Sequence, residues 1–265
     1  MTFANAERND QAEGLRQMFA HARVHFVPVV SNPHIAFGGV MLERLCTAFA
    51  ERQARVLVVD AAERAGVAGE MAMIDLGQCI ERLSERVSYL PARGLPIRFV
   101  DTAGSTQEFL QRIAEAAPEC DVALIHATAS ELCRLFSQKR AGRVSGEMPC
   151  PIVLADDRPD SVTHAYAAMK LLAKRAGLEV FDLVLGAAAH SPRAERIAIQ
   201  LATCADGFFG AVLRSAARID PAGDAREPPG ADLRRLVGDR LGASRPSRAS
   251  RVQAIAAPTS SLASS

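Results

Sequence analysis

Short apolar runs alternate with longer stretches of helical spacing along most of the chain. Residues 24–30 and 55–60 are predicted to be buried strands, and residues 38–52 between them repeat apolar side chains at helical intervals. Strands joined by helices of this length form βαβ units. The sequence therefore predicts an α/β fold with a doubly wound, mostly parallel sheet. Further strands are expected at 87–90, 97–100, 121–126, 151–155, 181–185 and 208–213. Further helices are expected at 75–85, 106–116, 159–176 and 193–205, and another follows the strand at 121–126 and ends at residue 134.

The two ends of the chain depart from this alternation. Residues 1–22 begin as a polar lead and continue as a short amphipathic helix, with apolar side chains at helical spacing at Ala12, Leu15, Met18 and Phe19. From residue 220 onward the composition turns to proline, glycine, alanine, arginine and serine, and only 231–241 keeps a helical pattern. We therefore predict three parts: an N-terminal helix in 1–22, an α/β domain over 23–221, and a C-terminal segment over 222–265 with a disordered tail.

Composition and charge narrow the kind of protein. Of the 265 residues, 49% are hydrophobic and 23% are charged, which is typical of a folded globular chain. No apolar run reaches the ~20 residues that cross a bilayer, and the first ten residues carry no secretory signal pattern. A net charge of +1 argues against a nucleic-acid binder. Six cysteines are scattered singly, which predicts reduced thiols in the cytoplasm and no metal site.

A resemblance to a known family begins at the first predicted strand. Residues 29–60 read VVSNPHIAFGGVMLERLCTAFAERQARVLVVD. This segment is similar, without a gap, to the opening of the MinD/ParA family of deviant P-loop ATPases, which has a strand, then S-G-K-G-G-V-G-K-T-T, a helix, and A-E-R-G-x-R-V-L-x-x-D. The resemblance implies a P-loop NTPase-like fold of the MinD type, with ATP hydrolysis as the activity of the family.

The flanks of this segment match the family, but the loop does not. A P-loop holds phosphate through consecutive backbone N–H groups, a lysine and a hydroxyl on Mg²⁺. This chain lacks both lysines and the Thr-Thr pair of the family pattern, and Pro33 has no N–H to offer. We therefore expect no ATP or Mg²⁺ cofactor, and we predict a degenerate nucleotide loop at Asn32, Pro33, Gly38, Gly39 and Val40.

Three strand-end positions of the family's nucleotide site are also changed. Asp60 matches the first acid of a D-x-D pair, His126 replaces the Walker B aspartate, and Gly186 replaces an asparagine on the adenine side. The resemblance makes these three residues remnants of a vacated site, and we expect no catalytic residues in this chain. Asp156 ends another predicted strand, where a turn or helix-start role is favoured over a ligand contact.

Two further motifs resemble one branch of the family, the FlhG (or FleN) regulators of flagellar number. Residues 10–16 read DQAEGLR against the pattern D-Q-A-x-x-L-R, and residues 158–170 read RPDSVTHAYAAMK against P-E-x-x-S-x-T-D-A-Y-A-x-x-K. In this branch the N-terminal helix contacts the GTPase FlhF and stimulates its hydrolysis. Flagellar switch proteins or a transcription factor are further candidate partners. The resemblance assigns partner binding to Asp10, Gln11, Ala12, Leu15 and Arg16.

The helical pattern near the C-terminus raises the question of membrane contact. MinD-like proteins carry a C-terminal amphipathic helix that docks on the membrane, which would place this chain peripherally at the inner membrane or the cell pole. One such helix binds weakly, and a helix packed on the body of the protein, or simply exposed, is the open alternative. The candidate membrane-facing residues are Leu233, Leu236, Val237 and Leu241.

These observations predict an FlhG-like regulator of flagellar number or placement that binds an FlhF-type GTPase and has little or no ATPase activity. Two alternatives stay open. One is an active or cryptic MinD/ParA-type ATPase, whose phosphate is held by arginines such as Arg44 or by a rearranged loop. The other is a MinD-like accessory factor of another polar or secretion machine, such as that of cellulose secretion.

Overall fold

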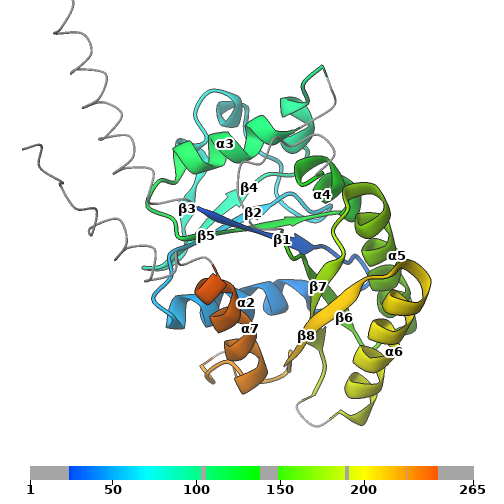
Figure 1. Ribbon diagram of the computed structural model, residues 1–265. Helices are drawn as coiled ribbons and strands as arrows, with labels where there is room; N and C mark the ends of the chain where they lie inside the picture. Colours follow the sequence, from blue (N-terminus) through cyan, green and yellow to red (C-terminus); the bar gives the residue numbers. More distant parts are fainter. Residues whose placement is uncertain (1–23, 103–105, 138–148, 189–190, 225, 244–265) are drawn as a thin grey trace, which may run out of the picture.

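The computed structural model describes residues 24–102, 106–137, 149–188, 191–224 and 226–243. In this part of the chain, eight strands form one sheet in the order β3-β4-β2-β5-β1-β6-β7-β8 (Figure 1). Neighbouring strands are parallel except β3 and β4, which are antiparallel. The predicted α/β fold with a mostly parallel sheet is therefore confirmed. The predicted N-terminal helix and nearly all of the predicted tail lie outside the described residues.

Strands and helices alternate along most of the chain. The strands are β1 His25–Val30, β2 Val56–Asp60, β3 Glu81–Arg82, β4 Val87–Pro91, β5 Val122–Ala127, β6 Ile152–Asp156, β7 Val180–Gly186 and β8 Val212–Ile219. The α-helices are α2 Gly38–Glu51, α3 Gln107–Ala116, α4 Ala129–Leu135, α5 Pro159–Ala176, α6 Pro192–Phe209 and α7 Ala231–Ala243. Between β2 and α3 lie the 3₁₀ helices η1 Glu70–Met73, η2 Gly77–Cys79 and η3 Pro96–Phe99.

Two predicted elements are wrong in the stretch between β2 and α3. Residues 75–85, predicted as a helix, contain η2 and the short strand β3 instead. The Asp75 carboxylate accepts the N–H of Gly77 at 2.9 Å, and this local turn competes with helix formation. Residues 97–100, predicted as a strand, belong mostly to η3, which begins at Pro96, a residue that cannot donate to a sheet ladder.

Helix ends follow local sequence signals. Helix α6 continues to Phe209, so the strand predicted from residue 208 begins only at Val212. Gly210 ends this helix with a φ of 67°, a left-handed conformation that glycine adopts at low cost. At the start of α4, Thr128 and Glu131 form a reciprocal capping box, which satisfies backbone N–H groups of the first turn.

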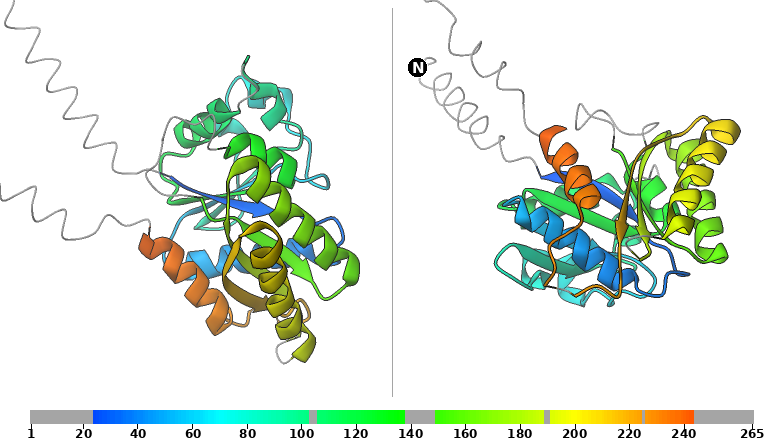
Figure 2. Two further views of the ribbon diagram at one scale, coloured as in Figure 1. Left: turned by 45° about the vertical axis from the view of Figure 1, so that its right-hand side comes forward. Right: turned by 90° about the horizontal axis from the view of Figure 1, so that it is seen from below.

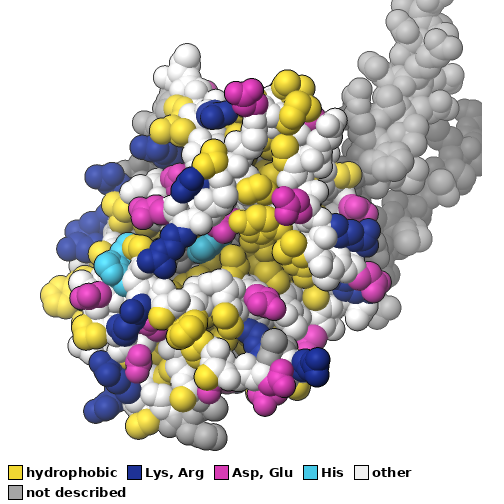
Figure 3. Space-filling view, turned by 180° about the vertical axis from the view of Figure 1, so that it is seen from behind, with side chains coloured by type: hydrophobic (Ala, Val, Ile, Leu, Met, Phe, Trp, Pro, Cys, Tyr) yellow, Lys and Arg dark blue, Asp and Glu magenta, His cyan; other side chains and the backbone are white. Residues whose placement is uncertain are grey.

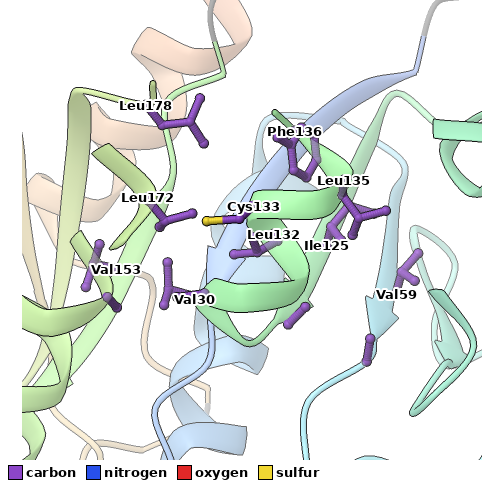
Figure 4. Close-up of a cluster of buried hydrophobic side chains, with 14 of the residues drawn as sticks. Val30, Val59, Ile125, Leu132, Cys133, Leu135, Phe136, Val153, Leu172 and Leu178 are labelled. Carbon is purple, nitrogen blue, oxygen red and sulfur yellow. The ribbon is translucent and has the colours of Figure 1, made fainter. Parts of the chain in front are cut away.

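The sheet separates two layers of helices (Figures 1 and 2). Helices α2 and α7 cover one face, and α3, α4, α5 and α6 cover the other. Because both faces are covered, the central strands are buried on both sides, and residues 56–59 of β2 are each at most 3% exposed. Figure 4 shows part of the core under α4, where Cys133 points toward Leu172 of α5, next to Val30 of β1.

Helix α7 packs its apolar side against α2 and the sheet. Leu233, Leu236 and Val237 are at most 1% exposed, and they share a buried cluster with the inner side of α2; Leu241 packs against that cluster. The expectation of a membrane-facing helix is therefore corrected, because in the folded chain this apolar face is covered by protein and not open to lipid. In the part of the chain that the structure describes, no helix is both long and apolar enough to span a bilayer.

A buried ion network fixes α7 to the sheet. Asp182 on β7 is fully buried and accepts hydrogen bonds from Arg240 of α7 at 2.6 Å and from Arg214 of β8 at 2.5 Å. The Ser215 hydroxyl donates a further hydrogen bond at 2.7 Å. Burial acts to raise the pKa of Asp182, but the Arg214 hydrogen bond and the Arg240 charge outweigh it and hold the pKa below its usual value.

We predict that Asp182→Ala lowers the free energy of unfolding by about 3–5 kcal/mol, because it removes the fully buried carboxylate that pairs with the buried Arg240 guanidinium. Glu51→Ala is the matched control. Glu51 also holds α7, through Arg234 at 3.3 Å, but both side chains are more than a third exposed. We expect the control to lose at most about 1 kcal/mol. Urea unfolding measures both variants, and equal losses would contradict the anchoring role of Asp182.

Candidate functional site

The strand order reverses around β1, which creates a crevice at the carboxyl edge of the sheet. The chain leaves β1 through α2 on one face of the sheet. It leaves β5 and β6, the two neighbours of β1, through α4 and α5 on the other face. In open α/β sheets, ligands bind outside the carboxyl ends of the strands at such a point. The loop at residues 31–37, between β1 and α2, therefore lies where a ligand is expected.

Asn32 fixes this loop from inside. The residue is 9% exposed, and its amide nitrogen donates to the carbonyl oxygens of Leu154 and Ser161 at 3.1 and 3.0 Å and to the Ser161 hydroxyl at 3.1 Å. The amide oxygen of Asn32 accepts the N–H of His34 at 3.1 Å. Asn32 therefore ties the end of β1 to β6 and α5 through bonds that the glycine of the family pattern could not make.

A carboxylate from a neighbouring strand binds the second half of the loop. Asp156, at the end of β6, is 8% exposed and accepts the N–H of Ala36 at 3.3 Å. The same carboxylate accepts the backbone N–H and Nε of Arg158 at 3.1 and 3.0 Å, which confirms the turn role expected of Asp156. The N–H of Ile35 donates to the Asn32 carbonyl at 3.2 Å. The N–H groups of residues 34, 35 and 36 thus all donate to acceptors within the chain.

The first turn of α2 offers no charged or hydroxyl side chain to a ligand. Gly38, Gly39 and Val40 form this turn, and Phe37 precedes it with no capping hydrogen bond and 57% of its surface exposed. The end of β7 is closed as well. A Cβ at Gly186 would lie 2.9 Å from the sulfur of Met41, which is itself fully buried. The Met41 side chain therefore fills the space beside Gly186, the residue that the resemblance places on the adenine side of the nucleotide site.

The register of β2 and β5 places Asp60 beside His126. Asp60 Oδ1 lies 2.8 Å from His126 Nδ1, and the carboxylate also accepts the N–H of Ala62 at 3.2 Å and the Tyr89 hydroxyl at 3.3 Å. Burial acts to raise the pKa of Asp60, but the His126 contact and the other donors outweigh it, so the pKa lies below its usual value. Two residues singled out in the sequence thus join one hydrogen-bonded group, and Tyr89 is a member that the sequence analysis missed.

The structure also bears on two other possible ligand sites, a cluster of metal-binding side chains and an arginine that could hold phosphate. Among the residues that the structure describes, no group of three or more His, Cys, Asp or Glu side chains could hold a metal ion. Arg44, considered above as a substitute phosphate ligand, is 8% exposed and donates to the carbonyl oxygens of Asp224 and Glu227. Its guanidinium therefore holds the segment that leads into α7.

A cavity of about 240 Å³ lies beside the loop and is lined by Pro33, His34, Ile35, Ala36, Arg64, Arg158 and Asp160. Arg64 reaches it from the segment after β2 and donates to the Pro33 carbonyl at 3.0 Å. Figure 3 shows histidine side chains close to basic (Lys or Arg) side chains on one part of the molecular surface, beside a broad hydrophobic area. Sequence reasoning missed Arg64 and Arg158 as a pair, because they come from loops almost a hundred positions apart.

Comparison with solved structures identifies the fold. MinD from Aquifex aeolicus has a TM-score of 0.53 at 11% identity, over 84% of this chain and 99% of that one. A plasmid partition protein from Borrelia burgdorferi, bound to AMPPNP, has a TM-score of 0.52 at 9% identity, over 84% and 100%. MinD from Pyrococcus horikoshii, complexed with Mg-ADP, has a TM-score of 0.50 at 16% identity, over 84% and 99%. The chain has the MinD/ParA-type P-loop fold.

Likeness at these identities shows the fold and not the activity. No protein-family model matches the sequence, and no curated protein matches it. Within the MinD/ParA-type fold, the predicted loop residues 32–40 and the strand-end residues Asp60, His126 and Gly186 all lie at the carboxyl edge of the sheet. The residues assigned to partner binding lie outside the described part of the chain; they are Asp10, Gln11, Ala12, Leu15 and Arg16.

The contact between Asp60 and Tyr89 predicts a specific titration. Burial, together with the neighbouring Asp60 charge, raises the pKa of Tyr89 to about 12. We predict that Asp60→Asn lowers this pKa, because the variant removes the negative charge that opposes ionisation of the phenol. Burial persists in the variant, so the pKa should stay above about 10.

Ultraviolet absorbance measured during alkaline titration reports this pKa. The chain has two tyrosines, so a Tyr166→Phe background leaves Tyr89 as the only titrating phenol. Both proteins in the comparison should carry this background. A Tyr89 pKa that is unchanged by Asp60→Asn would contradict the contact.

Proposed function

We propose that this chain is a regulatory binding protein on the MinD/ParA-type fold and that it neither binds nor hydrolyses ATP through the loop after β1. The observation that carries the proposal is the internal use of the loop N–H groups at residues 34–36, which donate to Asn32 and Asp156. A phosphate cradle needs such donors directed at the ligand. Here they are directed at the protein.

The charges around the loop support the same conclusion. A nucleotide phosphate would have to displace the Asp156 carboxylate from Ala36 and would then lie close to a buried negative charge. Arg158 already pairs with that carboxylate at 3.0 Å. The three lysines of the chain are at positions 139, 170 and 174, so no lysine in the loop could bind the phosphate. Opening the loop would also break hydrogen bonds of the buried Asn32 amide, and each buried polar group left unsatisfied costs about 1–3 kcal/mol.

The partner in this proposal is an FlhF-type GTPase, and the role is control of flagellar number or placement. Its support is the resemblance of residues 10–16 and 158–170 to the FlhG branch. Residues 10–16 would supply the contact, because Leu15 provides apolar surface and Arg16 lies beside it, and arginine is a frequent anchor at interfaces. Flagellar switch proteins or a flagellar transcription factor are further partners under the same proposal.

Calorimetric titration of the full chain tests both parts of the proposal. We expect no binding heat with Mg-ATP or Mg-ADP up to millimolar nucleotide, and saturable binding of GTP-loaded FlhF. Arg16→Ala should weaken FlhF binding about 30-fold, the effect of losing an interface anchor worth roughly 2 kcal/mol. Arg8→Ala is the matched control, since it removes an arginine just outside the motif, and it should leave the affinity unchanged.

The outcomes separate the two parts. Micromolar binding of Mg-nucleotide would refute the closed loop and would favour a cryptic ATPase. Loss of FlhF binding that is equal in Arg16→Ala and Arg8→Ala, or no FlhF binding at all, would refute the choice of partner. In that case the absence of nucleotide binding would still support the closed loop.

A further inference from the structure

The stretch between β2 and α3 exposes much of the apolar surface of this molecule. Ile74 is 80% exposed, and Met71 and Met73, just before it in sequence, are 45% and 44% exposed. Clustered apolar surface of this kind marks interaction sites more often than scattered single residues do. The exposed large apolar side chains of this stretch are Val67, Met71, Met73, Ile74, Leu83, Ile97 and Val100.

A groove of about 180 Å³ lies within this surface, between η1 and α3. The charged side chains of its lining are Asp75, Arg112 and Glu115; Arg112 pairs with Glu115 at 4.0 Å, so the excess negative charge lies at Asp75. Its apolar lining includes Met73, Ile74, Leu76 and Phe99. The groove therefore fits a short apolar stripe that carries a positive charge at its edge.

The first part of the chain enters the fold on the side of the sheet that carries this groove. Val24, the first described residue, shares a buried cluster with Leu76, which also lines the groove. The N–H of His25 donates to the Asp121 carbonyl at 3.0 Å. Ala116, another lining residue, precedes Asp121 by five positions, a span of at most ~18 Å at ~3.6 Å per residue. A segment ending at residue 23 can therefore reach the groove without crossing the molecule.

We propose that residues 10–22 of this same chain dock in the groove. Their apolar positions, Ala12, Leu15, Met18 and Phe19, fall on one side at helical spacing and can face the apolar lining of the groove. A 13-residue helix is ~20 Å long, so it stays within reach of its attachment at Val24. Arg16 lies next to the stripe and adds a positive charge on the side of Asp75, while Glu115 in the same lining pairs with Arg112 at 4.0 Å.

Docking of this kind regulates the partner interaction. While residues 10–22 occupy the groove, Leu15 and Arg16 are covered and cannot contact another protein. Docking and partner binding therefore exclude each other. This regulatory consequence rests on the proposed function, whereas the docking itself does not.

Hydrogen–deuterium exchange of the full chain tests the docking without any partner. We expect the amides of residues 12–19 to exchange at least about tenfold more slowly than in a free peptide of the same sequence. Ile74→Asp should remove this protection, because it places a charge in the apolar groove; the exposure of Ile74 leaves the fold intact. Val67→Asp is the matched control, since Val67 is 60% exposed but does not line the groove.

Three results would overturn the docking: no protection of residues 12–19 in the unmodified chain, protection that survives Ile74→Asp, or protection that disappears on dilution. The last would assign the groove to a second copy of the chain. A second arm uses FlhF. If docking holds about nine-tenths of the molecules, Ile74→Asp should tighten apparent FlhF binding about tenfold, and Val67→Asp should not. Lost protection without tighter FlhF binding would refute the regulatory consequence and leave the docking supported.

Discussion

The hydrogen bonding inside the loop between β1 and α2 is the constraint on which the rest of the site depends. In a P-loop, backbone N–H groups stay available until a phosphate arrives. Here Asn32 and Asp156 accept them; Asn32 also donates to β6 and α5, and Asp156 ends β6 and binds Arg158 just before α5, so the loop is held from two sides. The conformation of the loop is therefore part of the packing of the domain. The chain thus combines the MinD/ParA-type fold with a loop whose N–H groups at residues 34–36 donate within the protein.

Residues far away in sequence decide which surface the apolar side of the C-terminal helix contacts. The apolar stripe of α7 fits a lipid surface as well as a protein surface when it is read alone. Asp182 and Arg240 decide between these, because their buried ion pair positions α7 on the sheet and directs the stripe toward α2. Arg44 adds a second tie by holding the segment that precedes α7. One layer of the fold therefore depends on residues beyond the predicted domain end at 221.

The sequence predicted the sheet well because buried parallel strands have a local signature, as in the apolar run of β2. It failed between β2 and α3, where a side-chain turn at Asp75 and the ring of Pro96 replace regular elements. The site was harder to predict for a different reason. Asp156 and Ala36 are 120 positions apart, and Asp60 and His126 are 66 apart, so their contacts follow from strand order and register and have no local signal.

The most direct test of the closed loop is residue-resolved amide exchange at positions 34–36, measured by NMR with and without Mg-ATP. Donation of these N–H groups to Asn32 and Asp156 predicts slow exchange that Mg-ATP leaves unchanged. Asp156→Ala should then speed exchange at residue 36 more than at residue 34. Fast exchange in the free chain, followed by protection when Mg-ATP is added, would show that the donors await a phosphate and would contradict the closed loop.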